Sequence, residues 1–143
     1  MHQKITIALD MMSGDHGTSS SAPAAIDSLN KFNDIFLLLI GDEDQINSLL
    51  SEKIKKLEGV KYRIIHTKEH ISMNDDIVSA IRSKKKSSMR LAVNAVKNNE
   101  ADACVSAGNT GALMALSKII LKTIPGIDRP AIAGILPTMK GQT

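Results

Sequence analysis

The sequence has very few aromatic residues: of its 143 residues none is Trp, one is Tyr and two are Phe. A hydrophobic core must therefore consist of aliphatic side chains and methionine, which are plentiful because hydrophobic residues make up 43% of the chain. Proteins that bind single-stranded nucleic acid stack the bases on aromatic side chains. The composition therefore argues against a nucleic-acid partner.

Cysteine and long apolar runs are also scarce. The single cysteine, Cys104, excludes an internal disulfide framework and a zinc site built from several cysteines, and its apolar surroundings favour a core position. The longest apolar run, residues 35–40, is much shorter than the roughly 20 residues that span a bilayer. Asp10 interrupts the N-terminal apolar run before it reaches signal-peptide length. We therefore expect a soluble, cytoplasmic chain with no metal and no cofactor.

Positive charge is concentrated in one segment. The formal net charge is only +3, yet residues 82–90 contain five Lys and Arg residues. Such a cluster attracts phosphate, an acidic protein or anionic lipid, although a charge run is often only a solvated face. Ser87 and Ser88 interrupt the cluster. A helix that begins there would direct its free N–H groups toward an anion.

Apolar runs and helical spacings alternate along the chain. Strands are expected at residues 4–9, 35–40, 62–66, 103–106 and 131–136. Helices are expected at residues 22–32, 75–96 in two pieces, and 112–122, and a further helix is expected to run from an N-cap at Asp42 or Asp44 to about Lys56. This alternation predicts right-handed βαβ units and a mostly parallel sheet. Because ligands bind such sheets beyond the carboxyl ends of the strands, the loops at residues 10–17 and 106–111 are the candidate sites.

The loop at residues 106–111 reads Ser-Ala-Gly-Asn-Thr-Gly and joins a strand to a helix. Gly108 and Gly111 allow close approach of the backbone, while the N–H groups that open the helix favour an anion. Ser106, Asn109 and Thr110 add side-chain donors. The loop matches neither the Walker A nor the dinucleotide-binding pattern. A glycine turn with a simple helix cap is an equally good interpretation of the spacing.

The loop at residues 10–17 holds two carboxylates and an imidazole, from Asp10, Asp15 and His16. These groups could orient a substrate, but no second cluster completes a metal-ligand set. The alternative interpretation is a polar turn with a solvated histidine. The remaining histidines in the middle of the chain, His66 and His70, have no partner that the sequence identifies.

Four short sequence motifs, taken in their order along the chain, resemble those of a known protein family. They are Gly-Asp-His at 14–16, Lys-Lys-Ser-Ser-Met at 85–89, Ser-Ala-Gly-Asn-Thr-Gly-Ala at 106–112 and Pro-Gly-Ile-Asp-Arg-Pro at 125–130. Together they closely resemble the N-terminal part of the phosphate acyltransferase (PlsX) family of bacterial phospholipid synthesis. The first loop departs from the family's usual Asp-Ala-Met-Gly-Gly-Asp-His-Ala-Pro at residues 11, 13, 17 and 18.

The resemblance implies a reaction in which inorganic phosphate attacks the thioester of acyl-acyl carrier protein and yields acyl phosphate. It also implies a three-layer α/β/α fold like those of isopropylmalate dehydrogenases and phosphotransacetylases, a homodimer, and peripheral contact with the anionic cytoplasmic membrane. Family members continue beyond this length. We therefore expect residues 1–143 to be the N-terminal part of a single larger α/β domain, truncated and inactive alone.

Phosphate is partly dianionic at neutral pH and a thiolate leaves without full protonation, so the reaction needs groups that hold anions more than a catalytic triad. The predicted catalytic residues are Asn109, His16 and Asp15. The predicted phosphate- and substrate-binding residues are Ser106, Gly108, Thr110, Gly111, Lys85, Lys86, Ser87, Ser88 and Arg90. Two alternatives stay open: a phosphotransacetylase-like enzyme that uses acyl-coenzyme A, and a non-enzymatic basic adaptor that binds an acidic partner.

Overall fold

A four-stranded parallel sheet forms the centre of the molecule. The structure is a computed structural model that describes residues 4–134, 137–138 and 141–142. The strands are β1 (Ile5–Asp10), β2 (Ile35–Gly41), β3 (Tyr62–His66) and β4 (Ala103–Val105), and their order across the sheet is β3-β2-β1-β4. All three neighbouring pairs are parallel, as the alternation of strands and helices predicts.

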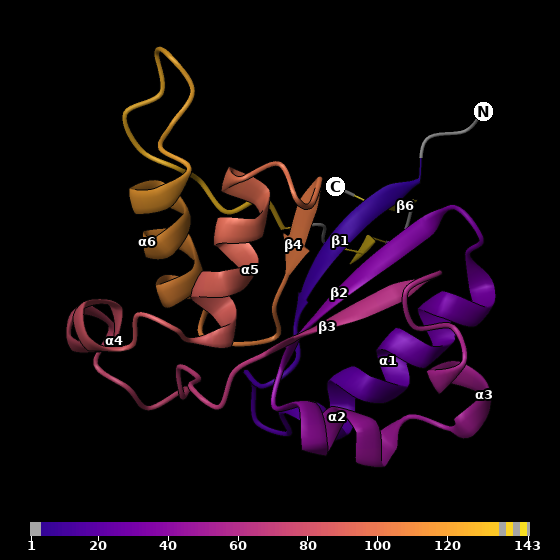
Figure 1. Ribbon diagram of the computed structural model, residues 1–143. Helices are drawn as coiled ribbons and strands as arrows, with labels where there is room; N and C mark the ends of the chain where they lie inside the picture. The colour runs from indigo at the N-terminus through magenta and orange to yellow at the C-terminus, as the bar shows by residue number, and fades with distance from the viewer. Residues whose placement is uncertain (1–3, 135–136, 139–140, 143) are drawn as a thin grey trace.

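Helices cover both faces of this sheet. Their bounds are α1 (Thr18–Lys31), α2 (Glu43–Leu49), α3 (Glu52–Lys55), α4 (Ile77–Ser83), α5 (Ser88–Lys97) and α6 (Thr110–Ile120). Figure 1 shows α1, α2 and α3 on one side of the sheet and α4, α5 and α6 on the other. The prediction of a three-layer α/β/α fold is therefore confirmed.

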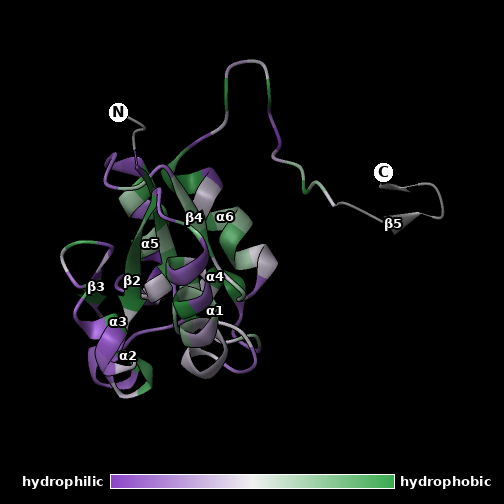
Figure 2. Ribbon diagram, turned by 90° about the vertical axis from the view of Figure 1, so that its right-hand side faces the viewer, coloured by the Kyte–Doolittle hydropathy of each residue, from purple (hydrophilic) through white to green (hydrophobic). Residues whose placement is uncertain are grey.

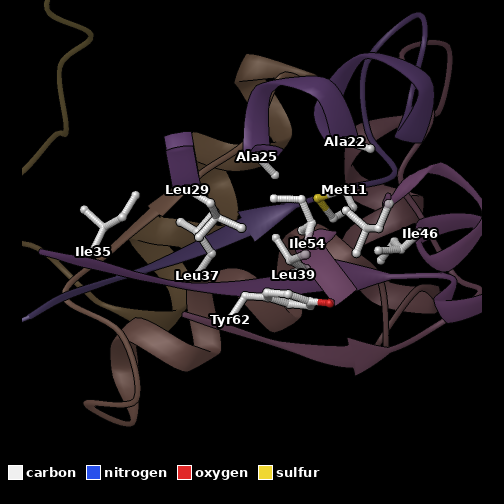
Figure 3. Packing of buried hydrophobic residues seen from close by; sticks show 11 residues of the cluster. Met11, Ala22, Ala25, Leu29, Ile35, Leu37, Leu39, Ile46, Ile54 and Tyr62 are labelled. Atoms are coloured by element: carbon white, nitrogen blue, oxygen red, sulfur yellow. The ribbon is translucent and has the colours of Figure 1, made fainter. Parts of the chain in front are cut away.

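The core is aliphatic, as the scarcity of aromatic residues requires. Leu37 and Leu39 of β2 pack against α1, and Figure 3 shows their side chains facing Ala25 and Leu29. The alternate residues of β2 point to the opposite face and pack against α5. Burying each leucine contributes about 1.5–3 kcal/mol to folding. The continuous apolar run at residues 35–40 is thus explained by burial of β2 on both faces.

Three element predictions depart most clearly from the structure, while the helix expected at 112–122 is only displaced by two residues. The first helix begins at Thr18 instead of Ala22, because serines with no apolar signal form its first turn. The helix expected to run to about Lys56 begins after the predicted cap Asp42 but is divided into α2 and α3, with Ser51 as the N-cap of the second piece. Residues 131–134 of the expected last strand have no regular structure, and residues 135–136 lie outside the described residues.

A strand needs a partner for its backbone groups, and none of the described strands pairs with residues 131–134. Figure 2 shows the chain after α6 leaving the sheet and helices in an extended segment. Beyond it, β5 (Pro137–Thr138) and β6 (Gly141–Gln142) form a short antiparallel pair. No helix in the described part of the chain is both long and apolar enough to cross a membrane.

The strand order places the candidate loops next to each other. From β1 the chain proceeds to β2 and β3 on one side, and it then crosses to β4 on the other side of β1. Such a reversal is a topological switch point, where the loops beyond the carboxyl ends diverge and leave a crevice. The loops that follow β1 and β4 therefore meet at the same edge of the sheet, as the sequence predicts.

Candidate active site

A hydrogen-bonded carboxylate joins the two loops at the switch point. The hydroxyl of Ser106, directly after β4, donates to Oδ2 of Asp10 at 2.7 Å. Asp10 is the last residue of β1 and is only 1% exposed. Its other oxygen, Oδ1, accepts the backbone N–H groups of Met12 and Ser13 at 3.2 and 3.3 Å. The carboxylate thereby fixes the start of both loops.

Two glycines let these loops touch. A Cβ on Gly14, whose φ is +94°, would lie 2.9 Å from the carbonyl oxygen of Ala107. A Cβ on Gly108 would lie 2.5 Å from the Cβ of Ser13 and 2.8 Å from Cε of Met89, in the first turn of α5. Any side chain at either position would push the loops apart. The close approach explains why the sequence has glycine at both places.

Asn109 caps α6 and leaves donors free beside it. Its Oδ1 accepts the N–H of Ala112 at 3.0 Å, and its side-chain amide donates to the carbonyl of Met73 at 3.3 Å. The N–H groups of Thr110 and Gly111 have no partner among the described residues. With no acidic residue in the first turn of α6, these N–H groups and the helix dipole favour an anion. The cap and the anion site are therefore compatible interpretations of this loop.

The lysine run, residues 84–86, contributes exposed charge just before α5. Lys84 forms an ion pair with Asp75, and this contact holds the pKa of the Asp75 carboxyl below its usual value. Lys85 and Lys86 are exposed and take part in no ion pair between described residues. They directly precede α5, whose first turn contacts Gly108.

The other predicted residues of this segment are buried or half-buried in the fold. Ser87 and Ser88 are completely buried, and the hydroxyl of Ser87 donates to the carbonyl of Lys84 at 3.1 Å. The buried hydroxyl of Ser88 has no hydrogen-bond partner among the residues that the structure describes. Arg90 directs one guanidinium nitrogen to the carbonyl of Ile81 at 2.8 Å, so it binds the end of α4. A role for these three residues in binding phosphate stays a prediction.

Asp15 and His16 are exposed and line two clefts that do not include residues 106–111. His16 lines a cleft of about 390 Å³ together with Gln45 and His70. Asp15 lines a smaller cleft of about 210 Å³, which His70 also borders. The structure places their loop against Ala107, and the cleft that Asp15 lines is also lined by Met73, whose carbonyl accepts the amide of Asn109. His70, for which the sequence identified no partner, belongs to both clefts.

A third cleft runs along α6 from the start of that helix. It has a volume of about 320 Å³, and Gly111 lines it at one end and Lys118 further along. Arg129 and Pro130 from the segment after α6 also border it. Two cations therefore share a cleft with Gly111, whose N–H has no partner in the described part of the chain.

The remaining chemistry-bearing group is Cys104, which lies half-buried in β4. Burial, together with the negative charge of Asp10, raises the pKa of its thiol. A higher pKa keeps the thiol protonated at neutral pH, so Cys104 is a poor nucleophile. Within the described residues, no group of three or more His, Cys, Asp or Glu side chains could hold a metal ion.

Known proteins are similar to this chain over almost its entire length. A family model described as "Fatty acid synthesis protein" matches residues 5–143. The chain belongs to this family. Proteins named phosphate acyltransferase are 51% identical over 96% of the chain in Methylococcus capsulatus, and 53% identical over 93% of it in Coxiella burnetii. A protein of the same name from Nitrosococcus oceani is 50% identical over 96% of the chain.

This member of the fatty acid synthesis protein family spans about 40% of the length of those relatives. Three groups that the fold brings to the site region are absent from the predicted catalytic and binding residues: the Asp10 carboxylate, the His70 imidazole and the Arg129 guanidinium. For Asp10 a signal existed, because it ends a buried strand next to a candidate loop. His70 and Arg129 lie in segments without periodicity, so only tertiary contacts select them.

Proposed function

We propose that this chain is part of an acyltransferase that forms acyl phosphate from inorganic phosphate and the thioester of acyl-acyl carrier protein. The observation that carries the proposal is the pair of free N–H groups, on Thr110 and Gly111, at the start of α6. They lie at the switch point of a parallel sheet, where ligands bind. The relatives named phosphate acyltransferase support an acyl substrate and phosphate.

The reaction mainly requires that the protein hold phosphate and the thioester in position. A phosphate oxygen attacks the thioester carbon, the carbonyl oxygen takes up negative charge, the C–S bond breaks, and the thiolate takes a proton from solvent or a nearby acid. N–H groups at a helix N-terminus stabilise phosphate or the oxyanion without reorganising. Asn109 fixes these groups through its cap. His16 is the proposed proton donor or orienting group, and Asp15 is proposed to border the same substrate cleft.

The proposed protein and membrane partners are inferred from exposed positive charge. The exposed Lys85 and Lys86 would attract an acidic carrier protein, and the same positive face would contact an anionic membrane peripherally. We further propose that residues 1–143 belong to a single larger α/β domain that acts as a cytoplasmic homodimer. The expectation of larger size is supported by the length of the relatives.

A transfer assay tests this function. Residues 1–143 are joined to the remaining C-terminal part of the Methylococcus capsulatus relative, and acyl phosphate is trapped as the hydroxamate. We expect phosphate-dependent product from acyl-acyl carrier protein, and Asn109→Ala should reduce its formation by about one to three orders of magnitude, as for loss of an oxyanion donor. Asn30→Ala, on the exposed side of α1, is the matched control. Wild-type turnover with an unchanged phosphate KM in Asn109→Ala would contradict the assignment, and product from acyl-coenzyme A alone would identify the alternative donor.

A further inference from the structure

Asp10 is a buried carboxylate that forms no ion pair with any described residue. It is 1% exposed, and the three ion pairs in the described part of the chain do not involve it. Its partners are the hydroxyl of Ser106 and the N–H groups of Met12 and Ser13. Burying an unpaired charge is unfavourable. All three partners donate, however, and a carboxylate is the side chain that offers acceptors alone.

The Ser106 hydroxyl transmits this contact to the loop before α6. Its single proton is directed at Asp10, so only its lone pairs remain, and one of them accepts the N–H of Gly108 at 3.1 Å. A hydroxyl that donates to a carboxylate becomes a stronger acceptor, because hydrogen bonds in a chain polarise one another. The N–H of Gly108 is thereby occupied, whereas those of Thr110 and Gly111 are free.

We propose that Asp10 is a positioning residue of the anion site and acts through Ser106. The carboxylate accepts the hydrogen bond from the Ser106 hydroxyl, Ser106 accepts the N–H of Gly108, and the loop then presents Thr110 and Gly111 to the bound anion. In this arrangement Ser106 contacts the loop and not the phosphate. The inference rests on the proposed function for the identity of the anion. The chain of hydrogen bonds from Gly108 through Ser106 to Asp10, called the relay below, does not depend on that identity.

The relay is tested without phosphate by the Gly108 amide resonance in NMR spectra of the ¹⁵N-labelled chain. In Asp10→Asn an amide group replaces one of the accepting oxygens, so the bond from Gly108 to Ser106 changes and we expect its resonance to shift. Asp42→Asn makes the same substitution directly after β2, where the side chain caps α2, and should leave Gly108 unmoved. Thermal unfolding verifies that each variant is folded. A Gly108 resonance unaffected by Asp10→Asn overturns the proposal.

A double-mutant cycle on phosphate affinity is the second test. Calorimetry gives the Kd for inorganic phosphate in the fusion with the C-terminal part of the Methylococcus capsulatus relative, as the wild type, Asp10→Asn, Ser106→Ala and the double variant. We expect the fold-change in phosphate Kd caused by Asp10→Asn to differ at least about fivefold between the background with Ser106 and the Ser106→Ala background. The reason is that the two residues act as a unit. If the Kd of the double variant changes by the product of the two single fold-changes, the residues act independently and the proposal is overturned. If the wild type binds no phosphate, the proposed function fails, and the Gly108 resonance alone decides the role of Asp10.

Discussion

Asn109→Asp separates the capping role of this side chain from its place beside the anion site. Asn109 uses its Oδ1 to cap α6 and its amide group to contact the carbonyl of Met73. An aspartate keeps the acceptor for the cap, and aspartate is as good an N-cap as asparagine. It loses the donor and adds a negative charge next to the free N–H groups. Asn109→Ala, by comparison, removes the cap and the donor without adding charge.

The magnitudes follow from these contacts. Loss of an N-cap costs about 1 kcal/mol, and loss of the bond to Met73 costs about 0.5–1 kcal/mol. Asn109→Ala should therefore lower the Tm by about 4–8 °C for a domain of this size. Asn109→Asp should stay within about 1 kcal/mol of the wild type. The new carboxylate would repel a bound phosphate. At a separation of about 6 Å and an effective dielectric constant of about 20, this repulsion costs roughly 3 kcal/mol for each phosphate charge, which weakens phosphate binding about 100-fold or more.

Thermal unfolding and phosphate calorimetry at low salt measure the two effects in the same samples. Asp42→Ala is the control for the cap, because it removes the capping side chain of α2 on the other face of the sheet. It should lower the Tm and leave phosphate binding unchanged. Wild-type phosphate affinity in Asn109→Asp would refute the placement of the anion at the start of α6.

Three other predictions concern the loops and charges around the site. Gly14→Ala should lower the free energy of unfolding by about 1–3 kcal/mol in urea titrations, because φ is +94° and the added Cβ meets a backbone oxygen; unchanged stability would contradict the contact. Lys85→Glu with Lys86→Glu should weaken binding of acyl carrier protein and reduce its salt dependence in surface plasmon resonance, whereas salt-independent wild-type binding would contradict a charge-driven contact. Because Lys84 lowers the folded-state pKa of Asp75, the stabilisation is present above the ordinary carboxyl pKa near 3.8 and is lost as pH falls through the lowered value. The stability advantage of the wild type over Asp75→Asn should therefore shrink below about pH 4, and an advantage independent of pH would exclude this ion pair as its source.

Most of the fold was predictable because its signals are local. The continuous apolar run of β2 and the alternation of strands with helices depend on residues near one another in sequence. The predicted bounds of helices and strands were wrong where the sequence pattern was weak or where the structure depends on residues far apart in sequence. The serine-rich start of α1 has no apolar periodicity, and residues 131–134 have strand character without a neighbour among the described strands.

For the site, the sequence by itself determined which loops follow buried strands and which of them are rich in glycine and hydroxyl groups. Only the tertiary structure decided what each side chain does there. Ser106 meets Asp10 across 96 residues, and Asn109 meets Met73 across 36. The burial of Ser87 and Ser88 likewise depends on packing of separate segments. Periodicity and spacing report on neighbours within a few turns of chain, whereas hydrogen-bond partners at a switch point come from strands that the crossover of the fold brings side by side.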